Sequence, residues 1–277
     1  YKCESLTSID LPIAETIGGG AFDGCTDLTS IDLPKATSIG NFAFYKCESL
    51  TSIDLPIAET IGDCAFEECS SLTSIDLPVA TSIGDYAFRF CTSLESIDLP
   101  IAETIGDYAL GNCISLTSID LPIATSIGGW AFGGCTDLTS IDLPIAETIG
   151  DYAFEGCDGL ESIDLPVATS IGNFAFQYCT SLISIDLPKA TSIGSYAFNN
   201  CTSLKSIAVP STATQGSNMF PFSSPTTLFL TDEGTTEDTA AGLATWGGVT
   251  WQTIYYGYHG SGDYLDPGSY EGQWTPE

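Results

Sequence analysis

The stretch TSIDLPIAETIGDYAFEGC, residues 139–157, shows the unit from which most of this chain is built. Its SIDLP core first stands at 8–12 and recurs every 22 residues up to 184–188, and a divergent tenth copy, SIAVP, follows at 206–210. A period of about 20–50 residues is typical of solenoids, in which each unit buries its apolar side chains against the next. The repeat therefore predicts one elongated stack of coils.

One repeat unit, CTDLTSIDLPKATSIGNFAFYK at 25–46, can be followed as a single coil. Ile31 and Leu33 are two residues apart and share the buried face of a short strand, so Ser30 and Asp32 point to the opposite face. The spacing of the other apolar residues predicts an inward-facing return path and then a short helical or 3₁₀ segment. The buried residues of these two parts are Ala36, Ile39, Ala43, Phe44 and Cys47.

Written as C-x-x-L-x-x-I-x-L-P-x-A-x-x-I-G-x-x-A-F-x-x, the unit resembles the BspA-like, or Treponema pallidum-type, leucine-rich repeat over about residues 1–210. The resemblance implies an α/β repeat solenoid, right-handed, with a parallel β-sheet on its concave face and short helical or 3₁₀ segments on its convex face. It also implies a non-enzymatic, extracellular or cell-surface protein. The family's members are mostly bacterial and protist surface or secreted proteins associated with adhesion.

Three segments are predicted along the chain. Residues 1–210 form the solenoid, with about ten coils along roughly 45–50 Å at the spacing of parallel strands. Residues 211–256 form a C-terminal cap that shields the last coil, with Trp246 and Trp251 in its core. Residues 257–277 are Gly-rich and acidic, and we expect a flexible tail or linker there.

Local patterns predict the elements of the cap. STATQGSNMFPFSSP after residue 210 is interpreted as a loop, TTLFL (226–230) as a strand and VTWQTIYY (249–256) as another strand. TTEDTAAGLATW (235–246) is predicted to be a helix, because a Thr cap precedes acidic residues in its first turn. The chain opens with Tyr in mid-repeat, so we expect it to be a piece of a longer protein.

Charge limits the partners that the chain can bind. Six Lys and Arg face 36 Asp and Glu, which gives a net charge of −30. Nucleic acid is excluded as a partner because phosphate binding needs a cationic surface. No apolar run is long enough to span a membrane. Proteins, glycans, cations and other copies of this chain remain as candidate partners.

Nine aspartates occupy the same place in successive repeats, so stacking brings them into one column with about 4.8 Å per coil. Carboxylates at that distance repel each other, and a parallel column of Ser hydroxyls, bound cations or a ligand can offset the repulsion. Three interpretations stay open: a solvated column bonded to Ser, a weak Ca²⁺ site, and the footprint of a protein or glycan. This Asp column is Asp10, Asp32, Asp54, Asp76, Asp98, Asp120, Asp142, Asp164 and Asp186.

The residue after each IDLP is Ile, Val or Lys. A position that accepts Lys is not deep core, because a buried unpaired ammonium is costly. We therefore expect an exposed or half-exposed apolar stripe beside the Asp column, and a candidate binding surface with it. The position holds Ile13, Lys35, Ile57, Val79, Ile101, Ile123, Ile145, Val167 and Lys189, of which Ile57, Val79, Ile101, Ile123 and Ile145 are the central binding candidates. An Ala follows, and the two residues after it alternate between Glu-Thr and Thr-Ser up to residue 170, which makes the larger unit 44 residues.

Cys and aromatic residues form further columns. One Cys per repeat, from Cys3 to Cys201, predicts buried, reduced thiols, because disulfide frameworks and metal sites show clustered spacing. Cys64 lies out of register, and we expect it to be the most exposed and reactive thiol. The aromatic column is interpreted as cover for the outer flank, with a sugar or partner site as the alternative. It holds Phe42, Tyr86, Tyr108, Trp130, Tyr152, Phe174 and Tyr196.

The sequence contains no pattern typical of catalysis. His259 is the single histidine and lies in the predicted tail, so no Ser-His-Asp or Cys-His arrangement is available in the solenoid. No phosphate loop or zinc spacing is present, and no cofactor is expected. The prediction is a surface module for adhesion or protein interaction. The alternative is a structural repeat protein that assembles into fibres or matrix, with cations on its Asp column.

Overall fold

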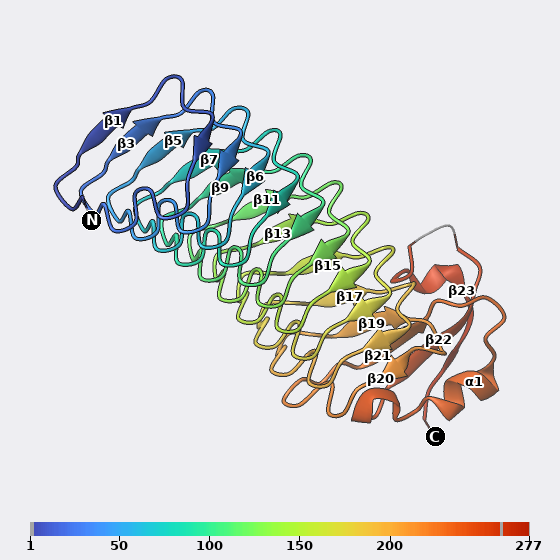
Figure 1. The fold of residues 1–277 in the computed structure, drawn as a ribbon. Helices are drawn as coiled ribbons and strands as arrows, with labels where there is room; N and C mark the ends of the chain where they lie inside the picture. Colours follow the sequence, from blue (N-terminus) through green and yellow to red (C-terminus); the bar gives the residue numbers. More distant parts are fainter. Residues whose placement is uncertain (1–2, 261–262, 277) are drawn as a thin grey trace.

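The structure is a computed structural model, and it describes residues 3–260 and 263–276. The chain winds into a parallel β-solenoid of about 11 turns with very little helix. Figure 1 shows the coils stacked along one axis, from the blue N-terminal end to the orange and red C-terminal end. The predicted repeat solenoid is confirmed, with one coil more than the SIDLP copies indicate.

The first strand of each coil has the sequence SID, with Ile buried between outward-facing Ser and Asp. These strands pair in parallel with their neighbours in three runs, interrupted between the third and fourth and between the fifth and sixth repeats, and within a run Ser, Ile and Asp lie opposite their own kind. These strands are β1 (Ser8–Asp10), β3 (Ser30–Asp32), β5 (Ser52–Asp54), β7 (Ser74–Asp76), β9 (Ser96–Asp98), β11 (Ser118–Asp120), β13 (Ser140–Asp142), β15 (Ser162–Asp164) and β17 (Ser184–Asp186). The longer β19 (Ser206–Val209) and β21 (Thr227–Leu230) continue the stack.

A second strand follows each corner, where the sequence predicts a plain return path. It has two residues, and in all but the last of these strands an Ile points into the core. Ten of these strands form one parallel sheet. They are β2 (Thr16–Ile17), β4 (Ser38–Ile39), β6 (Thr60–Ile61), β8 (Ser82–Ile83), β10 (Thr104–Ile105), β12 (Ser126–Ile127), β14 (Thr148–Ile149), β16 (Ser170–Ile171), β18 (Ser192–Ile193) and β20 (Thr214–Gln215).

The third side of each coil is a run of turns, so the predicted helical segments are wrong for the described solenoid. In the coil that contains residues 40–47, Phe42 and Lys46 have positive φ angles of 59° and 58°. An α-helix does not admit such angles. The Phe44 N–H donates to the Ala65 carbonyl of the next coil (2.7 Å). Hydrogen bonds between coils therefore replace those that a helix would make within itself.

The core is a stack of identical side chains from successive coils. Buried Phe rings lie face to face with centroids 5.1–5.6 Å apart, and Leu110 interrupts the stack once. The repeat Cys thiols from Cys47 to Cys201 donate to the carbonyl 25 residues earlier, at 3.0–3.2 Å. Ser223 makes the same bond in the next coil, to the Phe198 carbonyl (2.6 Å). The thiol thus acts as a buried hydrogen-bond donor between coils.

The expectation that Cys64 is the most exposed thiol is wrong. Cys64 is buried, whereas Cys3 is exposed. Burial, followed by a hydrogen bond and charge repulsion from Glu67, raises the pKa of Cys64 to about 12. Both effects disfavour the reactive thiolate.

The C-terminal cap extends the first sheet. β22 (Thr253–Tyr258) pairs in parallel with β21, and β23 (Tyr270–Trp274) pairs antiparallel with β22. Helix α1 (Glu237–Gly242) begins at Thr236, whose side chain accepts from the Thr239 N–H (3.3 Å). Short 3₁₀ segments η1 (Trp246–Gly248) and η2 (Pro267–Ser269) complete it. Trp246 and Trp251 are buried against the last Phe of the stack, Phe220.

Two expectations about this end need correction. The predicted loop after residue 210 contains β20 and Phe220, and it completes a further coil. β22 crosses the predicted boundary at residue 256, and β23 lies inside the predicted tail. Tyr270–Trp274 therefore belongs to the sheet, and Tyr264 and Leu265 pack beside it, while 261–262 and 277 lie outside the described residues. Both segments lack the SIDLP signal that marked the other coils.

Candidate interaction surface

The Asp column stands on the face that the first strands turn away from the core. Register places its members directly opposite each other in three runs: 10–32–54, 76–98 and 120–142–164–186. Eight of the nine side chains are exposed, and Asp186 is half-buried. The structure thus brings all nine predicted site aspartates onto one face.

The Ser residues do not satisfy these carboxylates. Among the described residues, no Ser hydroxyl donates to an aspartate of the column, so that part of the solvated-column interpretation is wrong. Ser30 and Asp32 are two residues apart on one strand, about 6.6 Å by the rise of a strand, and their side chains leave the sheet side by side. The carboxylates therefore face solvent, and their repulsion is not offset from within the protein.

Shallow grooves lie between the Ser and Asp columns. One has a volume of about 290 Å³, and its lining is Ile31, Asp32, Ser52, Ile53, Asp54, Ser74, Ile75 and Asp76. A second, of about 320 Å³, is lined by Ser162, Ile163, Asp164, Ser184, Asp186, Asp263 and Leu265. Strand backbone and Ile form the floor, and hydroxyls and carboxylates form the two walls. The second groove ends against the C-terminal segment.

Asp186 marks the place where the C-terminal segment covers the Asp column. In the next coils the Asp position is taken by Ala208 and Phe229, which pack with Tyr258 and Tyr270. One carboxylate oxygen of Asp186 is buried without a hydrogen-bond partner among the described residues. Burial, and then the charges of Asp164 and Asp263, raise the pKa of Asp186 to about 7. The open part of the Asp column therefore ends at Asp164.

The predicted apolar stripe borders this face at the corner between the two sheets. Ile57, Ile101 and Ile145 are 38–41% exposed, whereas Val79 and Ile123 in the intervening coils are half-buried. Exposure thus alternates with the same two-coil period as the Glu-Thr and Thr-Ser pairs. We call Ile57, Ile101 and Ile145 the Ile corner.

A second polar column, which the sequence analysis missed, serves the fold. The Asp85 N–H donates to Asp63 Oδ1 of the preceding coil (3.1 Å), and the Asp107 N–H donates to Asp85 Oδ1 (2.8 Å). Asn41, Asp107, Asp151, Asn173 and Ser195 accept in the same way. The mixture of Asn, Asp, Ser and Gly was the available signal, because all but Gly supply an acceptor oxygen. We call this set the acceptor column.

Most of the aromatic column is a stack of rings, whereas Phe42 lies outside it, 45% exposed and edge-on to Tyr45. From Tyr86 to Tyr196, successive rings are nearly parallel, with centroids 4.5–5.6 Å apart. Each inner ring is therefore covered on both faces by its neighbours, and its edge faces outward. A sugar binds an aromatic residue through the ring face, so this arrangement favours the interpretation as cover for the flank.

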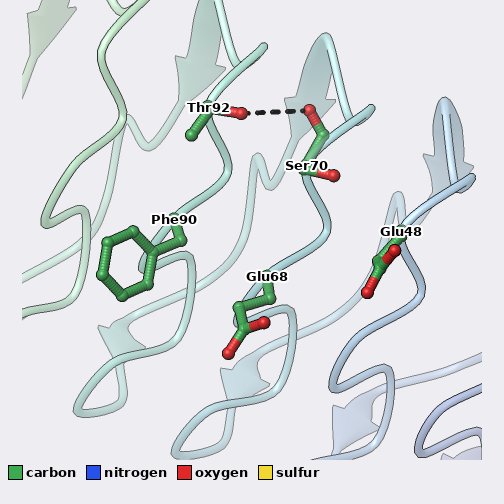
Figure 2. A pocket seen from close by; sticks show the side chains of 5 residues that line it. All are labelled: Glu48, Glu68, Ser70, Phe90 and Thr92. Carbon is green, nitrogen blue, oxygen red and sulfur yellow. Dashed lines mark hydrogen bonds between the residues drawn. The ribbon is translucent and has the colours of Figure 1, made fainter.

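A further pocket, of about 430 Å³, lies in the outer turns of the early coils. Figure 2 shows Glu48, Glu68 and Phe90 on neighbouring turns, with Thr92 hydrogen-bonded to the Ser70 carbonyl (3.5 Å). The Glu68 carboxylate already pairs with the Lys46 ammonium (3.5 Å). This pocket thus carries less unpaired charge than the Asp column and lies apart from it.

Residues 3–260 and 263–276 contain neither a candidate metal site nor a candidate membrane span. No group of three or more His, Cys, Asp or Glu residues is arranged there to hold a metal ion. In the same part of the chain, no helix has the length and apolar character needed to cross a membrane.

Similar proteins place the repeat in a known family. The family model described as "BspA type Leucine rich repeat region (6 copies)" matches residues 1–109, 59–168 and 103–226. No curated protein matches the sequence. Among solved structures, a leucine rich cell surface protein from Faecalibacterium prausnitzii is 26% identical, with a TM-score of 0.53 over 94% of this chain and 81% of that one.

Two other solved structures are similar. A leucine-rich repeat protein from Eubacterium ventriosum is 19% identical, with a TM-score of 0.52 over 80% of this chain and 84% of that one, and it supports the fold alone. The T. pallidum leucine rich repeat protein is 28% identical over 64% of this chain and 78% of that one, with a TM-score of 0.45. The family match extends over most of the coils described above, and the chain therefore belongs to the BspA type leucine-rich repeat family.

Proposed function

We propose that this protein is a non-enzymatic interaction module of a cell surface, and that the face bearing the Asp column and the Ile corner binds a basic protein partner. The observation that carries the proposal is the run of exposed carboxylates from Asp10 to Asp164 on one face. Location at a cell surface is supported by the likeness to the cell surface protein of Faecalibacterium prausnitzii.

The charge of this face is not neutralised from within. The two ion pairs among the described residues, Lys46–Glu68 and Arg89–Glu67, both lie in the outer turns, away from the Asp column. Lys35 and Lys189 are the cations nearest to the column by position in the repeat, and they stand near its two ends. A cationic partner would therefore relieve repulsion between aspartates as well as gain new ion pairs.

Shape and polarity support a macromolecular partner over a small molecule. The grooves between Ser and Asp are shallow and repeat along the solenoid, so they offer many equivalent contacts and no enclosed cavity. The Ile corner adds exposed apolar surface along one edge. Polar contacts beside apolar anchors are the usual composition of a protein interface.

Binding of a basic peptide tests the proposal. A fluorescein-labelled peptide rich in Lys and Pro is titrated with the protein at low and at physiological ionic strength, and anisotropy gives the Kd. In the test variant, Asp98, Asp120 and Asp142 become Asn. In the matched control variant, Asp63, Asp85 and Asp107 of the acceptor column become Asn, which keeps their acceptor oxygens.

Both variants lose three negative charges. A difference in Kd between them therefore reports the position of the carboxylates and not the net charge. We expect the test variant to bind about 10-fold more weakly than the parent, since each lost exposed ion pair costs up to about 1 kcal/mol. The Kd of the control variant should stay within about twofold of the parent value, because distant charges are screened beyond about 10 Å. An equal loss in both variants contradicts the proposal.

A further inference from the structure

The surface beside the Asp column repeats every two coils, and this period limits the conformation of a partner that lies along it. Ile57, Ile101 and Ile145 are exposed, and the coils between them carry half-buried Val79 and Ile123. Glu59, Glu103 and Glu147 stand in the same coils as these three Ile residues, and Thr takes the Glu position in the coils between. With about 4.8 Å per coil, the two-coil period is about 9.6 Å.

Among regular polypeptide conformations, polyproline II matches this period. It has three residues per turn and a rise of about 3.1 Å, so every third side chain repeats at about 9.3 Å. Alternate residues of an extended strand repeat at about 6.6 Å, and successive turns of an α-helix at about 5.4 Å. Neither of these lengths fits one coil or two.

We infer that the Asp face binds a cationic segment in the polyproline II conformation, with Lys or Arg at every third residue, lying along the axis of the solenoid. The inference rests on the proposed function and specifies the partner for the same face. Each cation would meet the carboxylate of every second coil and lie near the one between. The apolar residues between the cations would then lie over the Ile corner, which has the same period.

The chemistry of the face suits a backbone without internal hydrogen bonds. A polyproline II segment leaves its carbonyls free, and Pro removes N–H donors that would otherwise need partners. The exposed Ser column, which includes Ser52, Ser74 and Ser96, has no Asp partner and can donate to such carbonyls. The first strands contact one another along the whole stack, with ladder pairing interrupted between β5 and β7 and between β9 and β11, so this face leaves no gap for an added strand.

The C-terminal cover sets the length of the segment. The open column from Asp10 to Asp164 holds eight aspartates and ends where Tyr264 and Leu265 pack against the cap. Seven intervals of about 4.8 Å give about 34 Å, which is about eleven residues of polyproline II. A segment of that length carries three or four cations.

Two peptides of equal composition test the inference. One repeats Lys-Pro-Pro four times, and the other is Lys-Pro repeated four times followed by four Pro. Both adopt polyproline II with the same charge, but their Lys residues are about 9.3 Å and about 6.2 Å apart. We expect the first to bind about 3–10-fold more tightly, because misplacing one or two exposed pairs costs about 0.7–1.4 kcal/mol.

A pair of matched variants locates the apolar contact. Ile57, Ile101 and Ile145 are changed to Thr in one variant, and Val79, Ile123 and Val167 are changed to Thr in the other. The first should lose most of the preference for the three-residue spacing, and the second should retain it. Circular dichroism of both variants shows whether the solenoid is intact.

The outcomes separate this inference from the proposed function. If both peptides bind equally and lose affinity in the Asp98, Asp120 and Asp142 variant, the face binds basic partners and the spacing inference is wrong. Tighter binding of the Lys-Pro peptide also overturns the inference. If neither peptide responds to loss of these aspartates, the inference and the proposed function both fail.

Discussion

Asp186 shows how one position in a regular column acquires different chemistry. Its eight relatives are exposed, but the C-terminal segment covers it and leaves one oxygen without a partner among the described residues. The charged form is disfavoured by burial and by Asp164 and Asp263, which raise the pKa to about 7. The unfolded chain would have the ordinary value of about 3.9.

This raised pKa predicts the pH dependence of stability. The folded protein favours the protonated form of Asp186. The resulting contribution to the free energy of unfolding is fully present below the unfolded pKa and is lost as pH rises through the folded pKa near 7. Asp186→Asn, which stays neutral, should therefore be more stable than the parent above this pH, on the order of 1–3 kcal/mol after allowance for partial exposure, and similar to it near pH 4. Thermal unfolding of both proteins across this range checks the prediction. A gain of the same size near pH 4 would contradict it.

Gly129 breaks the acceptor column and supplies a second test at a single residue. It follows Asp107, which accepts its N–H, but it offers no oxygen to the Asp151 N–H of the next coil. Its φ is not positive, so a side chain meets no strain from the backbone angle. Gly129→Asn should add the missing bond and stabilise the protein by about 0.5–1.5 kcal/mol.

The control for this substitution is Gly129→Ala, which adds a Cβ and removes backbone freedom without adding an acceptor. Its Cβ would lie 3.2 Å from the Asp151 carbonyl oxygen, as would the Cβ of Asn. The difference in unfolding temperature between the two variants thus reports the hydrogen bond. If Ala and Asn have the same effect, the acceptor column does not stabilise the stack.

At the scale of the elements, repulsion within the Asp column destabilises the sheet that carries it. Two carboxylates about 4.8 Å apart repel by about 0.9 kcal/mol even at the dielectric constant of water. No Ser hydroxyl among the described residues offsets this, since the two columns stand side by side. The backbone ladder and the buried Ile and Leu must therefore outweigh the repulsion.

Changing Asp98, Asp120 and Asp142 to Asn should consequently raise stability near pH 7, by on the order of 1–3 kcal/mol at low ionic strength. Salt should reduce the difference, because it screens exposed charges beyond about 10 Å at physiological concentrations. Thermal midpoints of parent and variant at several salt concentrations give the answer. A variant that is no more stable at low salt would show that the carboxylates are already satisfied.

Sequence alone predicted those elements whose signal repeats over many coils. The SID strand, the buried Leu and Phe, the exposed Asp and the corner Ile all follow from side-chain alternation and from substitution by Lys. The second strand was missed because two residues are too few to show alternation. The outer turns were predicted as helix because Ala43, Phe44 and Cys47 have helical spacing, yet Phe42 and Lys46 adopt positive φ.

The structure of the C-terminal segment depends on contacts between residues that are distant in the sequence, and no local pattern predicts these contacts. Residues 263–276 were predicted as a tail because they are rich in Gly and acid, but Tyr270 packs against Phe229 and Tyr258 far back along the chain. That cover is also what half-buries Asp186. The candidate surface was therefore predicted in its composition, while the position at which it ends required the fold.

At the scale of the whole molecule, the chain separates two acidic columns by function. The acceptor column holds the coils together through their N–H groups, whereas the Asp column leaves its oxygens to solvent on another face. The carboxylates that give the net charge of −30 therefore include some that hold the coils together and others that are exposed and can bind a partner. We propose that the second set binds the partner.

Carboxyl labelling with a carbodiimide and an amine, read by mass spectrometry with and without the Lys-Pro-Pro peptide, tests this assignment most directly. The account predicts that the peptide protects Asp98, Asp120 and Asp142 from labelling. Asp63 and Asp85 should be labelled to the same extent with and without peptide. Equal protection of both columns, or protection of the acceptor column alone, would contradict the claim that the Asp face is the binding surface.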